Sequence, residues 1–306
     1  LPPPLGAPRA PQMESKESED VRRESHVLAV AFNQDGTCAC VGTRSAFYVY
    51  STLPKCEPRL RSTVEGVRVM EMLYCSSLLA IVGSGDRFGS SPRKLQLFNS
   101  QDHSTICNLN FVSSILAVRM NRNRMVVCLQ DKLFIFSVPA LDNLHTLSTP
   151  PNPAGLCELS SDDTSYLAMP TPRVGEVLLY DTVALRLLTQ IEAHRSHALA
   201  AMAFSPSGTL LATASEHGTV VRVFSAPSGE HLCTLRRGST PSRIHSMSFL
   251  QSPPLLAVGG ASGTVHVFSL WGVVGGGASS AGSASGPGES TPAPSEAPPP
   301  PPRRRG

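Results

Sequence analysis

The chain has 306 residues, of which 41% are hydrophobic, enough to build the core of one large domain or two ordinary ones. Its formal net charge of +3 argues against a general nucleic-acid binder, so an anion site has to come from a local concentration of charge. No apolar run reaches about eighteen residues and no signal-peptide core is present, which argues against a membrane-spanning helix and secretion. Because the chain begins at Leu1 rather than Met, we expect either a fragment of a longer protein or the product of an incomplete gene prediction.

The eight cysteines are scattered through the chain, and Cys38 and Cys40 are the only close pair. There is no Cys-x-x-Cys motif and no Cys/His group with zinc spacing. We therefore interpret the cysteines as small buried residues of a protein in a reducing compartment. This interpretation predicts a cytoplasmic protein without a metal or cofactor.

Residues 1–25 are rich in proline and then in charged side chains, and we predict a disordered N-terminal segment. From residue 26 onward, an apolar strand that ends in an aromatic residue recurs. The last four endings are spaced 44 residues apart, and the earlier ones are less regular. In chain order the endings are Tyr50, Phe98, Phe136, Tyr180, Phe224 and Phe268. A period of about 40–45 residues with several short strands per unit predicts a β-propeller.

Residues 198–235 show one unit in full, with four short strands separated by turns that contain Gly. Six such units fit between residues 26 and 271, and the sixth stops after its third strand. Because an open propeller leaves unpaired strand edges, we expect an all-β, seven-bladed propeller that this chain truncates within or after blade six. Such a chain should be markedly less stable than a longer version.

Arg236 and Arg237 stand together at the end of the fourth strand of unit five. Successive side chains of a strand point to opposite faces, so this pair indicates either two solvated charges or two anion sites back to back. Gly238 then permits the tight backbone turn that leads on to the next blade.

Residues that suit phosphate recur at equivalent places in units five and six. Arg222 and His266 each precede the strand-ending aromatic residue by two, and Thr219 and Thr264 each follow a turn glycine. Guanidinium groups and hydroxyls are good donors to phosphate. We predict a first site beside Arg236 and a second beside Arg237. The first comprises Arg222, Thr219, Ser215 and His194, and the second comprises His266, Thr264, Ser262 and His245.

Residues 272–306 consist mainly of Gly, Ala, Ser and Pro and lack the apolar side chains needed to fold alone. We predict a disordered segment that belongs to a long loop between the third and fourth strands of blade six. The polyproline run and Arg303–Arg305 are interpreted as part of a solvated linker, with a partner domain or an acidic surface as the alternative ligand.

The repeats resemble those of WD-repeat propellers, although Trp271 is the only tryptophan and no Trp-Asp dipeptide occurs. A closer resemblance is to the PROPPIN family, the phosphoinositide-binding propellers of autophagy. The sequence Leu-Arg-Arg-Gly at 235–238 is similar to that family's Phe/Leu-Arg-Arg-Gly signature. Further similar stretches, in the same order as in the family, lie at 92–98, 116–129, 149–157, 175–182, 193–225 and 263–268.

The resemblance implies a peripheral membrane protein with two headgroup pockets that flank Arg236 and Arg237. It implies binding to membranes with phosphatidylinositol 3-phosphate and the 3,5-bisphosphate, and an autophagy effector at preautophagosomal, endosomal or vacuolar membranes. It also implies that loops of blades two and three recruit autophagy factors, including a lipid-transfer protein. The candidate partner-binding residues are Arg93, Lys94, Arg122 and Arg124.

Several of these residues have a structural alternative. His194 stands where WD-repeat propellers use a histidine to tie strands together, and Thr219 and Ser215 can satisfy turn backbone groups. Residues 121–124 also read as a plain polar hairpin turn. Arg222 favours a ligand, because an unpaired charge within an apolar strand is costly.

Two departures from the family concern blade six. Gly259 and Gly260 stand where relatives often carry serines, so the second pocket is expected to be poorer in donors. In the family the blade-six loop inserts into the membrane. Here Trp271 is the candidate for such a contact, with ordinary packing as the alternative.

Enzymatic motifs are absent from the sequence: there is no Gly-x-Ser-x-Gly, no His-Glu-x-x-His and no convincing carboxylate pair. We therefore predict a binding protein. The alternative to a phosphoinositide-binding effector is a lipid-independent WD-repeat scaffold whose arginine pair contacts an acidic peptide.

Overall fold

A computed structural model describes residues 26–63, 66–86 and 89–274 of the chain. Within these ranges there are twenty-three β-strands in six antiparallel sheets and one helical turn, α2 at Trp271–Val274. No helix of the described residues is long enough to traverse a bilayer. The predicted N-terminal segment, and the predicted C-terminal segment from residue 275 onward, lie outside the described residues. Residues 272–274, predicted to be disordered, instead belong to α2.

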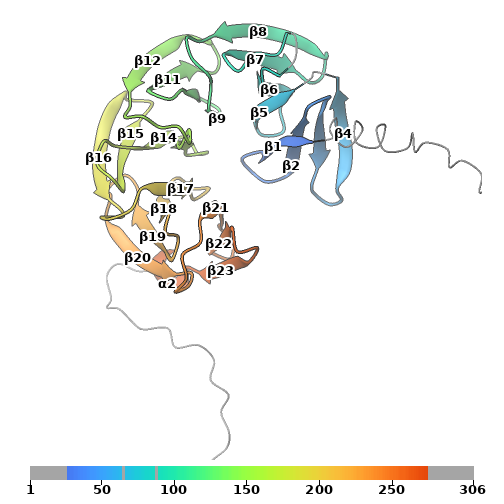
Figure 1. The fold of residues 1–306 in the computed structure, drawn as a ribbon. Coiled ribbons are helices and arrows are strands. Elements are labelled where there is room, and N and C mark those ends of the chain that lie inside the picture. Colours follow the sequence, from blue (N-terminus) through green and yellow to red (C-terminus); the bar gives the residue numbers. More distant parts are fainter. Residues whose placement is uncertain (1–25, 64–65, 87–88, 275–306) are drawn as a thin grey trace, which may run out of the picture. The chain divides into compact units, whose positions relative to one another are not determined.

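The sheets follow one another in chain order, with the first strand of each innermost and the last outermost (Figure 1). The strands of blades one to three are β1 Val27–Phe32, β2 Cys38–Thr43, β3 Phe47–Ser51, β4 Glu57–Ser62, β5 Val67–Met72, β6 Leu78–Gly83, β7 Lys94–Asn99, β8 Ser104–Asn110, β9 Ala117–Met120, β10 Arg124–Cys128, β11 Lys132–Ser137 and β12 Asn143–Ser148. Those of blades four to six are β13 Glu158–Leu159, β14 Tyr166–Pro170, β15 Glu176–Asp181, β16 Arg186–Glu192, β17 Leu199–Phe204, β18 Leu210–Ser215, β19 Val220–Ser225, β20 His231–Arg236, β21 Ile244–Leu250, β22 Leu255–Gly260 and β23 Val265–Ser269. Five sheets have four strands and the sixth has three, which confirms the predicted incomplete propeller.

The second strand of a blade consists mainly of apolar residues because both of its faces are covered by neighbouring blades. In β18 every side chain is buried, and β6 and β10 are buried over most of their length. The fourth strands β4 and β12, by contrast, expose most of their residues at the rim. A mostly apolar second strand and a polar fourth strand are therefore the local pattern of a sheet packed between two other sheets.

The hydrophobic core is divided among the interfaces between consecutive blades. Phe47 of blade one meets Phe98 of blade two edge-to-face, with ring centroids 5.7 Å apart. Leu211 and Phe224 of blade five pack against Leu179 of blade four. Blade one, on the face turned away from blade two, and blade six, on the face turned away from blade five, instead carry exposed apolar residues. This exposure agrees with the predicted incomplete propeller. The exposed residues include Val30, Phe32, Val265 and Val267.

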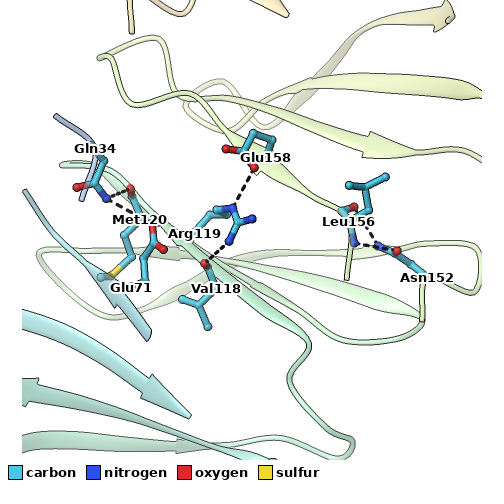
Figure 2. Close-up of polar contacts among 8 residues, drawn as sticks. All are labelled: Gln34, Glu71, Val118, Arg119, Met120, Asn152, Leu156 and Glu158. Atoms are coloured by element: carbon cyan, nitrogen blue, oxygen red, sulfur yellow. Dashed lines mark hydrogen bonds and ion pairs between the residues drawn. The ribbon is translucent and has the colours of Figure 1, made fainter. Parts of the chain in front are cut away.

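A polar network joins the inner strands of blades one to four (Figure 2). Arg119 of β9 donates its Nε to the Glu158 carboxylate of β13 at 3.0 Å. Gln34, in the β1–β2 turn, donates its Nε2 to the carbonyls of Met72 at 2.7 Å and Met120 at 2.8 Å. Nothing in the sequence predicted these contacts, since each one joins residues of different blades.

Glu71 of β5 lies at the centre of this network, where Gln34 and the Met120 amide each approach its Oε1 to 3.4 Å (Figure 2). Burial raises the pKa of Glu71 to about 8, and the nearby Arg119 guanidinium acts in the opposite direction. Glu71 is therefore largely protonated in the folded protein at neutral pH.

Candidate functional site

The register between β19 and β20 determines where the two adjacent arginines point. Arg236 lies opposite Val220, and Thr234 lies opposite Arg222. Opposed residues of an antiparallel pair share a face, so Arg222 and Arg236 lie on the same side of blade five. The amide of Arg237 donates to the Thr219 carbonyl at 2.9 Å, which continues the pairing by one residue. Alternation along the strand then places Arg237 on the other side.

The two sides of blade five face different neighbours. Leu211 and Phe224, which share a face with Arg222, pack against blade four. Val221 and Leu235 share the opposite face and pack against blade six. Arg222 and Arg236 are therefore directed toward the gap between blades four and five, and Arg237 toward the gap between blades five and six.

In the first gap, Arg222 is joined to the connection between blades four and five. Its Nη1 donates to the Ala193 carbonyl and lies 3.4 Å from Nδ1 of His194. Because a guanidinium only donates, Nδ1 accepts, and Nε2 carries the proton that it shares with Thr213 Oγ1 at 3.1 Å. Burial, followed by the Arg222 charge, lowers the pKa of His194 to about 4. His194 is thus a neutral, buried link between strands.

The hydroxyl residues of the first set occupy the β18–β19 turn. Ser215 ends β18 and is buried, while Thr219 is half-buried and its carbonyl accepts from the amides of Arg237 and Gly238. Gly218, at φ 63°, turns the chain between them. Arg236 makes no side-chain hydrogen bond or ion pair among the described residues and is exposed.

Arg237 is held by backbone carbonyls on the blade-six side. Its Nε donates to the Gly218 carbonyl at 2.8 Å and its Nη2 donates to the Thr240 carbonyl at 2.6 Å. These contacts leave the half-buried guanidinium oriented without an acidic partner among the described residues. A cation without a carboxylate partner suits a phosphate ligand.

The second predicted set lies along the neighbouring edge of blade six. Ser262 Oγ and Thr264 Oγ1 are 2.8 Å apart, and Thr264 Oγ1 lies 3.3 Å from Nε2 of His266. His266 lies opposite Val258, on the face that packs toward blade five. His245 is the exposed bulge residue near the start of β21.

Gly259 and Gly260 have little room for side chains. A Cβ on Gly260 would lie 2.9 Å from the Arg243 carbonyl, and one on Gly259 would lie 3.0 Å from Ser246 Oγ. A serine at 260 would therefore require the backbone at Arg243 to shift, whereas a serine at 259 would need only the Ser246 hydroxyl to turn away.

The candidate partner-binding residues differ in what they contact. Arg93 is exposed, and Lys94 Nζ donates to the Gly89 carbonyl at 3.3 Å. The guanidinium of Arg122 lies 4.4 Å from the centroid of the Tyr74 ring. Arg124 Nε donates to the Thr182 carbonyl of blade four at 2.8 Å. Arg124 thus has an internal role that its sequence context did not indicate.

The polar hairpin turn proposed as the alternative for residues 121–124 is present. The Asn121 side-chain oxygen accepts from the amides of Asn123 at 3.0 Å and Arg124 at 2.8 Å. Trp271 begins α2 and is 68% exposed, so its ring does not fill a core position.

Thr213 is the residue of the first gap that sequence reasoning missed. It lies two residues before Ser215 on β18, opposite Arg222, and its hydroxyl contacts His194. Strand alternation from Ser215 could have identified it. The Gly218 and Thr240 carbonyls that hold Arg237 leave no signal in the sequence.

Relatives of the chain carry names from autophagy. Autophagy-related protein 18 of Yarrowia lipolytica is 40% identical over 266 residues, covering 79% of this chain and 66% of that protein. The protein of the same name from Debaryomyces hansenii is 39% identical over 290 residues, covering 81% of this chain and 51% of that protein. The chain thus spans half to two thirds of the length of these relatives.

Solved structures share the fold. Kluyveromyces lactis Hsv2 with its complete loop 6CD matches with a TM-score of 0.70 at 21% identity, over 80% of this chain and 73% of that chain. KlAtg21, solved with the coiled-coil of AgAtg16, matches with a TM-score of 0.68 at 30% identity, over 80% of this chain and 81% of that chain. A family model described as PROPPIN matches residues 27–287. With a family model that covers most of its length and with these relatives, the chain belongs to the PROPPIN family.

Proposed function

We propose that the chain binds the phosphorylated headgroups of phosphoinositides at two pockets, one on each side of blade five. The observation that carries this proposal is the division of the arginine pair by the β19–β20 register. Arg222 and Arg236 serve the gap toward blade four, and Arg237 serves the gap toward blade six with Thr264 and His266. Phosphatidylinositol 3-phosphate and the 3,5-bisphosphate are the proposed lipids.

Attachment to a membrane depends on both pockets together. Once one headgroup is bound, the second binding event becomes intramolecular and can raise avidity about 10²–10⁴-fold. Each basic residue near an anionic leaflet adds roughly 1 kcal/mol. The segment from 222 to 243 carries four arginines against the single acidic residue Glu230, so its local charge favours such a surface.

We further propose a role as an autophagy effector at preautophagosomal, endosomal or vacuolar membranes. The names of the Yarrowia and Debaryomyces relatives support this role. The KlAtg21 complex supports recruitment of a coiled-coil partner, and a lipid-transfer protein is a second proposed partner. Exposed Arg93 and the surface cation Arg122 are the proposed contacts on blades two and three. The protein acts in this scheme by binding rather than by catalysis.

Liposome flotation with phosphatidylinositol 3-phosphate tests the lipid assignment. The double variant Arg236→Thr, Arg237→Thr should lose flotation while keeping the melting curve of the parent. Arg243→Thr removes a nearby exposed charge but no pocket residue, so this matched control should still float, weakened only by the loss of one charge. Undiminished flotation of a folded double variant would reject the proposal in favour of a scaffold that binds an acidic peptide.

A mutant cycle tests the division into two pockets. Arg222→Ala combined with Arg236→Ala should weaken binding little more than either change alone, because both empty one pocket. Arg222→Ala combined with Arg237→Ala should lose the avidity gain. Since Arg222 also holds the Ala193 carbonyl, each variant is compared only at a temperature where its melting curve shows a folded protein. Strong coupling between Arg222 and Arg237, with no coupling between Arg222 and Arg236, would contradict the division into two pockets.

A further inference from the structure

A cysteine of blade two lies against the β1–β2 turn of blade one. Cys75 stands in the turn between β5 and β6, and its sulfur is 3.1 Å from Thr37 Oγ1 and 3.8 Å from Asn33 Nδ2. Cys38, the first residue of β2, follows Thr37 directly, and its amide donates to Asn33 Oδ1 at 3.0 Å. The Cys75 sulfur therefore contacts Thr37, which precedes Cys38, and Asn33, which accepts from the Cys38 amide.

The turn that carries Cys75 is fixed against blade one. The Tyr74 amide donates to Gln34 Oε1 at 2.7 Å, and Ser76 closes the turn through its amide to the Leu73 carbonyl at 3.0 Å. Gln34 in turn belongs to the inner polar network. The turn with Cys75 is thus held against blade one by the Gln34 side chain, and Cys38 is held by the Asn33 side chain, rather than by the thiols themselves.

The two thiols interact and differ in access to solvent. Burial raises the pKa of the Cys38 thiol. The charge of Cys75, a hydrogen bond with Cys75 and the charge of Asp35 act in the same direction. Cys38 is half-buried and Cys75 is exposed. An oxidant in solution therefore reacts first with Cys75, and Cys38 supplies the second thiol.

The chain contains an internal comparison for this pair. Cys128 of blade three and Cys157 of blade four also lie together, in one core cluster at the interface between these blades. Both are buried, at 0% and 1% exposure. If thiol proximity alone decided oxidation, both pairs would react. If access also counts, only Cys38 and Cys75 react in the folded protein.

We propose that Cys38 and Cys75 form a redox modification site that closes into a disulfide between blades one and two when the protein meets a peroxide. The Cys75 thiolate attacks one peroxide oxygen, an S–O bond forms, the O–O bond breaks, and the departing hydroxide takes up a proton to become water. The Cys38 thiolate then attacks the Cys75 sulfur, and the S–O bond breaks with loss of a second water. Two thiols give up two electrons and two protons, and one peroxide becomes two waters.

The disulfide would join the two blades covalently and leave the arginine gaps untouched. Closing the chain from Cys38 to Cys75 restricts the unfolded state, so the oxidised protein should melt several degrees above the reduced protein. Lipid binding should not change, because Arg236 and Arg237 belong to blade five. The site is therefore independent of the proposed phosphoinositide function.

Peptide mapping tests the proposal directly. The full chain is treated with a small excess of hydrogen peroxide, free thiols are blocked with N-ethylmaleimide, and tryptic peptides are analysed without reduction. The peptide with Cys38 also contains Cys40, so Cys40→Ser is included to identify the linked residue. We expect one cross-link, from the Cys38 peptide to the Cys75 peptide, and we expect dithiothreitol to reverse it. The cross-link should also form in Cys40→Ser and in Cys56→Ser, the control for an exposed cysteine.

The single variant Cys38→Ser gives a second test, which measures the chemical state of Cys75 rather than the stability of the protein. In Cys38→Ser the exposed Cys75 should accumulate as a sulfenic acid that dimedone traps, because its resolving thiol is missing. Trapping of Cys75 in the parent to the same extent, or a peroxide-treated parent with Cys38 still open to N-ethylmaleimide, would overturn the proposal. So would a cross-link between Cys128 and Cys157 that forms first.

Discussion

Glu71 gives the sharpest test of the inner polar network. Burial raises its pKa from the ordinary 4.5 to about 8, and the Arg119 charge opposes that shift. The folded protein therefore keeps a proton that the unfolded chain releases at lower pH. The stability that neutral Glu71 contributes is fully present below about pH 4.5 and is lost as the pH rises through about 8.

The size of the effect follows from the two pKa values. At about 1.4 kcal/mol per unit, the shift from 4.5 to about 8 corresponds to a loss of about 5 kcal/mol of unfolding free energy at high pH. Glu71→Gln keeps the shape of the protonated acid and carries no charge. We expect this variant to match the parent near pH 5 and to exceed its stability by several kcal/mol near pH 9.

Urea unfolding of the parent and Glu71→Gln from about pH 5 to pH 9 measures this difference. The gap between their unfolding free energies should widen as the pH rises, with equal m values. Glu230→Gln, in the exposed β19–β20 turn, is the matched control, because it removes a carboxylate that is not buried. A gap for Glu71→Gln that stays constant with pH would mean that the folded protein holds Glu71 ionised, and the reasoning would be refuted.

Three further predictions concern the elements that hold the arginines. His194 is the opposite case to Glu71, because its pKa is lowered to about 4. Its stabilising contribution is present above about pH 6.5 and is lost as the pH falls through 4, so in His194→Gln the loss of unfolding free energy on the acid side should be smaller by roughly 3 kcal/mol. An unchanged loss of stability in acid would contradict this prediction. Gly218→Ala should cost about 1–3 kcal/mol or more in urea unfolding, because φ is 63° and the new Cβ would lie 1.9 Å from the Ser242 carbonyl oxygen; a parental midpoint would show that the turn can relax. Leu211→Ala should cost about 2–5 kcal/mol by the same assay, since Leu211 is fully buried between blades four and five, whereas exposed Leu144→Ala should cost far less.

The repeat and the strand types could be predicted from the sequence because both depend on short-range order. A fully covered strand such as β18 is mostly apolar, with Thr213 and Ser215 as its polar residues, and its turn needs the φ of 63° that Gly218 supplies. The opposite directions of Arg236 and Arg237 also follow from strand alternation alone, once the register of β20 is assumed. Each of these properties is set within a few residues along the chain.

Contacts between blades required the tertiary structure. His194 meets Arg222 and Thr213, Arg124 reaches the Thr182 carbonyl, and Cys75 lies against Thr37 only because sheets far apart in the sequence pack face to face. No local pattern encodes such pairs, since each partner alone reads as an ordinary polar turn or strand residue. Burial at these interfaces also sets the ionisation of His194 and Glu71, because desolvation depends on the neighbouring blade rather than on neighbouring residues in the chain.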